Sequence, residues 1–207
     1  MKSCLVFWIG CLGISTGLLA QASDPGDSIL NVLVWGIHMP IDSAAYSGVL
    51  RRDVDAYLLR ANAYRPTRAV PSAEDLRMVY DAWVNYERRL AAVSEDPGAS
   101  QLAREYVDAL RPCYEWEGNS DCPEHEALFA DEYQAAHPGG PFSAYLPLLS
   151  AHRWLCAAEG FDYERSPDDA ARSRQLYQER LAVALRSQVL LIRTASERLS
   201  SRGRCHE

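Results

Sequence analysis

The sequence contains almost no lysine. Lys2 is the only one among 207 residues, which otherwise carry 20 arginines against 28 aspartates and glutamates. A net negative charge disfavours binding to polyanions, because the summed charge of the protein repels them. We therefore expect no nucleic-acid partner, and we do not expect an anionic membrane surface to be the main partner.

The sequence also lacks the short motifs that identify common enzyme and ligand sites. Glycine-rich phosphate loops, dinucleotide fingerprints, calcium loops and the Gly-x-Ser-x-Gly nucleophile turn are all absent. Neither paired Cys-x-x-Cys knuckles nor a His-Glu-x-x-His sequence is present. These absences predict no catalytic residue and no cofactor, and they favour a protein that is not an enzyme.

Long hydrophobic runs are missing beyond the first 19 residues. Residues 5–19 form one apolar stretch of about 15 residues, which is shorter than the roughly 20 residues of a membrane span. Lys2 precedes this stretch and the small-x-small triplet Ala20-Gln21-Ala22 follows it, as in a Sec-type signal peptide. We expect residues 1–22 to be cleaved, which leaves a single domain over residues 23–207 with a formal charge of −8.

Two alternatives to cleavage are weaker. A retained membrane anchor would need a longer apolar run. Gly10-Cys11 could end a lipid-attachment box, but Trp8 stands where a leucine is usual, so a lipoprotein is disfavoured. The prediction is a periplasmic or secreted protein of a bacterium, without a transmembrane segment once the signal peptide is removed.

Four cysteines remain after the signal peptide: Cys113, Cys122, Cys156 and Cys205. An even number of cysteines in an exported chain predicts disulfides, here two of them. Sequence alone allows three pairings, and we favour Cys113 with Cys122 because the turn at residues 118–121 lets the chain double back. Cys156 would then pair with Cys205, which ties the end of the sequence to an interior helix.

The domain shows helical rather than strand periodicity. Apolar residues recur at three- and four-residue intervals between prolines and glycines, and no stretch alternates with a period of two. No fixed register appears at repeat lengths of 30 to 45 residues, which disfavours stacked helical repeats. The predicted helices cover residues 27–37, 42–64, 72–95, 100–110, 123–136, 142–159 and 166–200.

The last predicted helix has the clearest start signal. Ser166 is a helix-capping residue type, Pro167 suits the first helical position, and two aspartates follow in the first turn. A single helix to Ser200 would be roughly 50 Å long. We therefore predict an all-α fold, an irregular bundle of about six to seven helices packed along a long C-terminal helix and stapled by two disulfides.

Acidic residues and histidines are most frequent around the predicted cystine loop, in residues 115–137. Converging carboxylates and imidazoles can hold a divalent cation, so His125 and Glu126 are an alternative metal site, and a metal-assisted or acid–base hydrolase is the alternative function. His152 and Glu159 also lie seven residues apart, on one helical face. Oxidised cysteines and helix-packing histidines are the more common explanation of both patterns.

Aromatic residues offer a binding candidate. Tyr114 and Trp116 lie between the two cysteines of the predicted loop, where a rigid backbone would lose little entropy on binding a protein or a sugar ring. Trp83 and Trp154 lie instead on predicted apolar faces, and we expect both in the core. The arginines of the last helix alternate with acids, which predicts a solvated, salt-bridged surface.

The predicted function is a non-enzymatic binding protein of the cell envelope. The export signal, the stapled helices and the missing catalytic motifs support it, and an envelope protein or a glycan is the expected partner. The general plan is similar to that of lysozyme inhibitors and immunity proteins of the bacterial envelope. No residue motif of those families is present, so no functional residue can be assigned from them.

Overall fold

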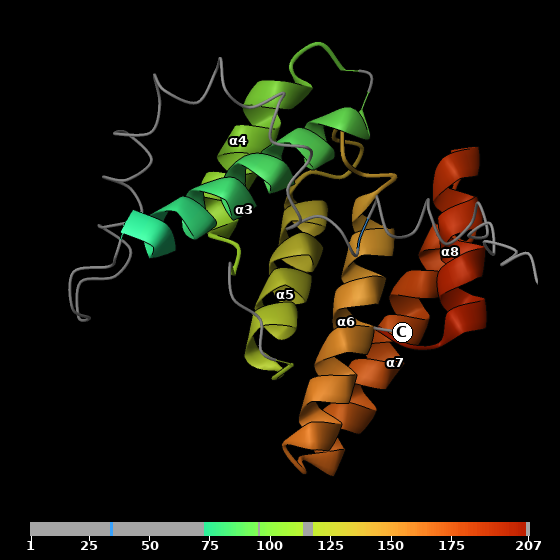
Figure 1. Ribbon diagram of the computed structural model, residues 1–207. Coiled ribbons are helices and arrows are strands. Elements are labelled where there is room, and N and C mark those ends of the chain that lie inside the picture. The colour runs from blue at the N-terminus through green and yellow to red at the C-terminus, as the bar shows by residue number, and fades with distance from the viewer. Residues whose placement is uncertain (1–33, 35–72, 95, 114–117, 206–207) are drawn as a thin grey trace, which may run out of the picture.

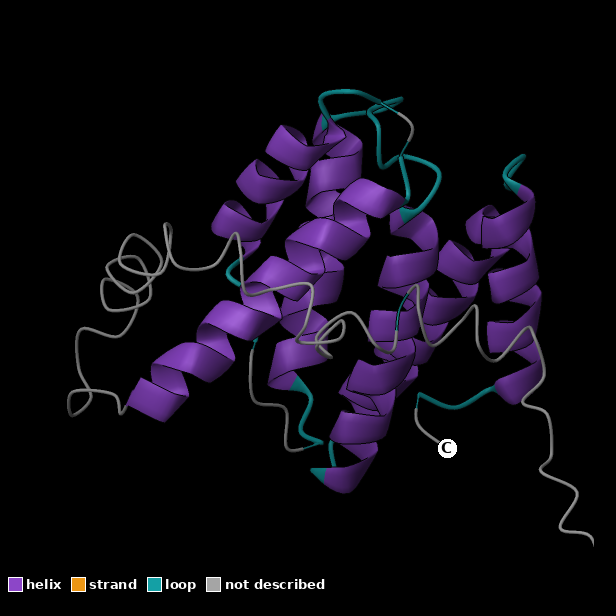
Figure 2. Cartoon of the chain, turned by 45° about the horizontal axis from the view of Figure 1, so that its top comes forward, coloured by secondary structure: helices purple, strands orange, loops and turns teal. Residues whose placement is uncertain are grey.

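The computed structural model of the protein describes Val34 and residues 73–94, 96–113 and 118–205. Within those ranges the regular structure is entirely helical, as Figure 2 shows, which confirms the all-α prediction. The predicted signal peptide and the predicted helices at residues 27–37 and 42–64 lie outside the described ranges, apart from Val34. The helices are α3 (Ala73–Ala92), α4 (Ala99–Leu110), α5 (Asp121–Ala136), α6 (Leu146–Tyr163), α7 (Pro167–Ala184) and α8 (Leu190–Arg202).

Helices α3 and α4 form a hairpin. Asp96 Oδ1 accepts a hydrogen bond from the Gly98 amide at 2.6 Å, and this contact shapes the turn before α4. Helix α4 ends at Arg111, whose φ of 53° is in the left-handed region, with its amide bonded to the Val107 carbonyl. Pro112 follows, so the chain cannot continue as a helix.

Helix α6 is the central element of the structure. It packs against α5 on one side and α7 on the other (Figure 1), and fourteen of its eighteen residues are buried. A helix that is apolar on nearly all sides must be covered on all sides. The fourteen buried residues of α6 are therefore part of the core.

Helix α6 begins and ends four residues later than the predicted range of 142–159, and it does not stop at Gly160. The helix continues through this glycine to Tyr163. A Cβ atom at position 160 would lie 2.6 Å from the Ser120 amide nitrogen, which is closer than real Cβ contacts. Gly160 therefore permits the backbone before α5 to touch α6, and it is a packing residue rather than a helix terminator.

The prediction of one helix over residues 166–200 is wrong, because this region folds as two helices. Helix α7 ends at Ala184 and α8 begins at Leu190, with Val189 in an extended conformation between them. The Val189 amide donates to Ser187 Oγ at 3.2 Å, so a side-chain hydrogen bond replaces a helical one. The start at Pro167 is confirmed, and Ser166 donates its hydroxyl to Asp169 there.

Aromatic side chains fill the core between the α3–α4 hairpin and α5. The ring of Tyr106, which is fully buried, lies edge-on to Phe129 and Tyr133 at centroid distances of 4.9 and 4.8 Å. Trp83 and Trp154 are 4% and 2% exposed, which confirms both as core residues. None of the helices within the described ranges is long and apolar enough to cross a membrane.

Candidate functional site

The predicted cystine loop is closed and held in place on its first side. Cys113 and Cys122 form a disulfide with their Cα atoms 5.9 Å apart, which confirms the favoured pairing. Directly before it, Trp83 Nε1 donates a hydrogen bond to the Pro112 carbonyl at 3.3 Å. Because Trp83 is buried in α3, this bond fixes the chain at the point where it enters the loop.

The second side of the loop is fixed by the last turn of α6 and the residue that follows it. The Ser120 amide donates to Glu164 Oε1 at 2.8 Å, and the Ser120 hydroxyl donates to Glu164 Oε2 at 2.7 Å. Gly160 lies against the same backbone at Asn119 and Ser120. One carboxylate therefore holds the residue that precedes α5 through two charge-assisted hydrogen bonds.

The binding candidates Tyr114 and Trp116 lie outside the described residues. We give the name frame to the described residues that hold the two sides of the loop: Trp83, Cys113, Ser120, Cys122, His125, Gly160 and Glu164. His125 belongs to that frame, because its Nε2 donates to the Leu110 carbonyl at 2.8 Å and so satisfies the end of α4. Sequence spacing did not reveal this role for His125, since the two residues are 15 positions apart.

His125 and Glu126 contact different parts of the protein. Glu126 is 2% exposed, and its carboxylate accepts a hydrogen bond from Arg153 Nε at 2.7 Å. His125 is instead bonded to the carbonyl at the end of α4. A metal ion shared by these two neighbours would have to replace both contacts.

Asp131, an acid in the polar stretch of residues 115–137, accepts hydrogen bonds from three side chains. Its Oδ1 accepts hydrogen bonds from Ser150 Oγ and Arg180 Nε, both at 2.7 Å, and its Oδ2 accepts one from Trp154 Nε1 at 3.1 Å. The hydrogen bond to Asp131 raises the pKa of Arg180. Asp131 thus links α5, α6 and α7, and its carboxylate is occupied by structural contacts.

A buried ion pair lies between α5 and α6. Burial, the largest single influence, lowers the pKa of Arg153, but the Glu126 carboxylate together with the neighbouring Tyr86 and Tyr145 raises it overall, so the guanidinium stays charged. Burial, and then the charge of neighbouring groups including Glu126, also raises the pKa of Tyr86 and Tyr106. Burial likewise raises the pKa of Tyr145, so all three phenols stay neutral. The pair is enclosed by neutral aromatic groups and serves the packing of the core.

His152 and Glu159, the second acid–base candidate, have hydrogen bonds to different groups. The Nδ1 atom of His152 accepts from Arg153 Nη1 at 2.9 Å and lies 3.5 Å from Cys156 Sγ. Glu159 Oε1 accepts from the Cys205 amide at 2.9 Å. Both side chains therefore support the second disulfide, Cys156–Cys205, whose Cα atoms are 4.8 Å apart.

Only one set of three potential metal ligands occurs among the described side chains. The ligand atoms of His152, Cys156 and Cys205 lie within 4.8 Å of one another, and all three residues are buried. The two sulfurs are bonded to each other. A cysteine binds zinc as a thiolate, so with both sulfurs oxidised this set holds a disulfide rather than a metal.

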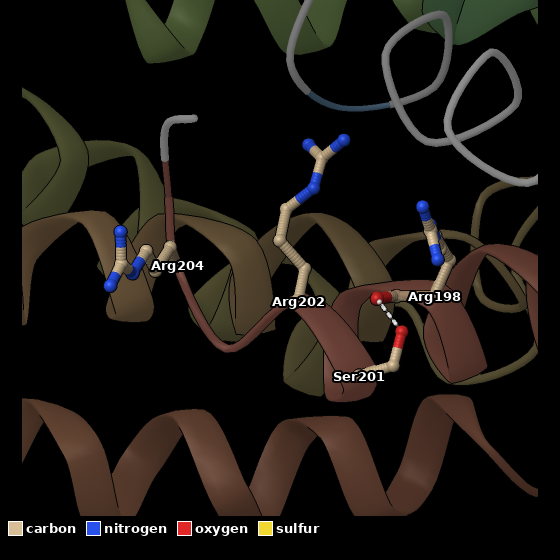
Figure 3. Close-up of a pocket in the computed structure, with 4 residues that line it drawn as sticks. All are labelled: Arg198, Ser201, Arg202 and Arg204. Carbon is tan, nitrogen blue, oxygen red and sulfur yellow. Dashed lines mark hydrogen bonds between the residues drawn. The ribbon is translucent and has the colours of Figure 1, made fainter. Parts of the chain in front are cut away.

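The arginines of the last predicted helix have two different environments. On α7, Arg174 pairs with Asp162 and Arg180 with Asp131, as the prediction of a salt-bridged surface requires. At the end of α8, Arg198, Ser201, Arg202 and Arg204 line a hollow of about 570 Å³. Figure 3 shows the side chains of Arg198 and Arg202 on the same side of α8, with Ser201 Oγ bonded to the Arg198 carbonyl.

Sequence reasoning missed this hollow, although a signal was present. Residues 184–205 contain five arginines and only one acid, Glu197. Arg198 and Arg202 have further interactions within the chain, while Arg204 is exposed. Counting the charge of the last segment separately from the whole chain would have identified a basic end on an acidic protein.

Comparison with protein-family models, with curated proteins and with solved structures finds no match for this chain. Its function must therefore be inferred from its own residues.

Proposed function

We propose that this protein is an exported, non-enzymatic binding protein of the bacterial cell envelope, similar in role to an inhibitor or an immunity protein. The frame around the Cys113–Cys122 disulfide is the observation that carries the proposal. A disulfide, the Trp83 indole and two hydrogen bonds to Glu164 fix both ends of a short segment. A segment that is anchored at both ends and carries Tyr114 and Trp116 suits recognition, because anchored ends reduce the entropy that is lost on binding.

The polar residues nearby support binding rather than catalysis. A general acid or base must reach the proton that it moves. His125 is bonded to the Leu110 carbonyl, and Glu126 is buried against Arg153. His137, at the end of the polar stretch of residues 115–137, bonds to the Tyr133 carbonyl and stacks on its ring. A hydrolase that used His125 and Glu126 would first have to break these contacts.

The test is retention of an envelope partner by single variants. We expect the wild-type protein, immobilised at neutral pH, to retain one partner from an envelope extract, and Trp116→Ala to reduce its affinity by about 2 kcal/mol, roughly thirtyfold. Binding should then be measured by calorimetry with the purified partner. A glycan partner would give the same loss with purified envelope polysaccharide.

Tyr163→Ala is the matched control, because the Tyr163 side chain is aromatic and 81% exposed, and it is not one of the side chains that anchor the loop, although it neighbours Glu164 in sequence. It should bind as the wild type does. Equal binding by wild type and Trp116→Ala would contradict the proposed surface. Recovery of the protein in the cytoplasm with residues 1–22 intact would contradict export. Stoichiometric zinc with free thiols would contradict the non-enzymatic class and favour the hydrolase.

A further inference from the structure

Four of the six large apolar side chains that the described residues expose lie where α7 meets α8. Val183 is 44% exposed, Val189 45%, Leu190 66% and Leu191 45%. We call these four residues the apolar corner. Exposed apolar residues that lie together mark sites of interaction, whereas single ones need no explanation.

The apolar corner has a defined shape. The Ser187 amide donates to the Ala184 carbonyl at 3.0 Å, and the Val189 amide donates to Ser187 Oγ at 3.2 Å. From α8, Arg193 Nη1 donates to the Ser187 carbonyl at 3.0 Å. The backbone between the helices is thus held from both sides, and the exposed leucines are presented by an ordered turn.

The stretch of chain that begins at the apolar corner and includes all of α8 is basic. Residues 184–205 carry five arginines against one acid, whereas residues 118–183 carry five arginines against eleven acids. The negative total charge of the chain conceals this distribution. Arg186 and Arg193 are close in sequence to the apolar corner, and Arg198, Arg202 and Arg204 line the hollow at the other end of α8.

We propose that the apolar corner and these arginines dock the protein on an anionic lipid surface. Leu190 and Leu191 would enter the boundary between headgroups and acyl chains, and the guanidinium groups would bind lipid phosphates. Leu191 and Arg198 are seven residues apart and Arg202 follows four later, so all three lie on one side of α8. Apolar insertion and charge together supply the two signals that stable membrane attachment needs.

Other occupants fit the corner less well. A second copy of this chain would bring its own five arginines against the first set, and like charges oppose that contact. An acidic protein has the required charge, but it would need a recess that matches Leu190, which is two-thirds exposed. A lipid surface accepts a protruding side chain without a shaped recess.

The experiment is vesicle flotation with protein recovered after expression of the full chain. We expect binding to vesicles of equal parts phosphatidylcholine and phosphatidylglycerol, and little binding to phosphatidylcholine alone. Leu190→Ser with Leu191→Ser should lower the partition coefficient about tenfold or more. Arg186→Gln should lower it about fivefold and leave a weaker dependence on salt.

The controls are Leu128→Ser, an exposed leucine on α5, and Arg172→Gln, an exposed arginine on α7. Both should bind as the wild type does, and all variants should melt at the same temperature. Equal binding to both kinds of vesicle, no binding, or equal losses in the controls would overturn the proposal. A wild-type dimer in light scattering that Leu190→Ser with Leu191→Ser converts to a monomer would also overturn it.

These outcomes are separate from those of the partner experiment. The docking surface contains no residue of the frame around Cys113 and Cys122. Loss of vesicle binding would therefore leave the role of Trp116 intact, and the reverse also holds.

Discussion

The two disulfides secure regions that differ in how much else holds them. Around Cys113–Cys122, hydrogen bonds from Trp83, His125 and Glu164 fix the same stretch of chain. Helix α8 contacts the rest of the described structure more sparsely, through one narrow buried face and the Cys156–Cys205 bond that follows its last turn. The buried residues of that face are Ile192, Ala195, Ser196 and Leu199.

This difference indicates two roles for the same chemistry. In the first region the disulfide adds to contacts that already define the backbone. In the second region it replaces the apolar burial that α8 lacks, and it also closes a much longer stretch of chain. The chain-entropy treatment gives about 4 kcal/mol for the separation of 49 residues and about 2.6 kcal/mol for that of nine.

The largest effect is expected from breaking the second disulfide. Cys156→Ser with Cys205→Ser should lower the free energy of unfolding by about 4 kcal/mol, because the unfolded chain gains the freedom that the bond removes. Guanidinium unfolding measures the loss. Hydrogen exchange should show that amides of α8 lose protection before those of α6. Equal protection of α6 and α8 in this variant would contradict a special dependence of α8 on the bond.

The next largest effect is expected from breaking the buried ion pair of Glu126 and Arg153, which joins α5 to α6 in the well-packed region. Glu126→Gln should cost about 3 kcal/mol in the same unfolding experiment, because Arg153 is left buried without its counter-charge. Replacing both residues by methionine should cost much less, since no unpaired charge remains. A loss confined to local exchange around Glu126, with the unfolding midpoint unchanged, would show that the pair does not stabilise the core.

The smallest effect is expected from the first disulfide. Cys113→Ser with Cys122→Ser should cost about 2.6 kcal/mol or less, because the surrounding hydrogen bonds retain part of the native geometry. Adding Glu164→Ala should then cost more than it does alone, since each anchor compensates for loss of the other. A double-mutant cycle in denaturant measures this coupling, and strict additivity would show that the anchors act independently.

Much of the fold could be predicted from sequence because its signals are local. Capping residues, prolines and apolar spacing located both ends of helices α3 to α6, and the start of α7, to within about four residues. The pairing of Cys113 with Cys122 followed from the turn between them, and Cys156–Cys205 followed by elimination. The break between α7 and α8 was missed because Ser187 and Val189 are not strong helix breakers, and a side-chain hydrogen bond decides their conformation.

The polar contacts could not be predicted, since they join residues far apart in sequence. Arg153 and Glu126 are separated by 27 positions, Arg180 and Asp131 by 49, and neither pair has a sequence pattern. Gly160 was misread for the same reason, because its requirement comes from the backbone of Ser120. The density of acids and histidines in residues 115–137 suggested a shared site, yet its described members serve separate helix contacts.

The spacing of the second disulfide imposes an order on oxidation. Cys122 follows Cys113 by nine residues, so these two thiols are synthesised almost together, whereas Cys156 precedes its partner by 49 residues. If the chain enters an oxidising compartment from its N-terminus, Cys156 arrives before Cys205. Until Cys205 follows, Cys156 can pair with Cys113 or Cys122 unless those two have already joined. Early closure of the short loop would thus protect the chain from mispairing.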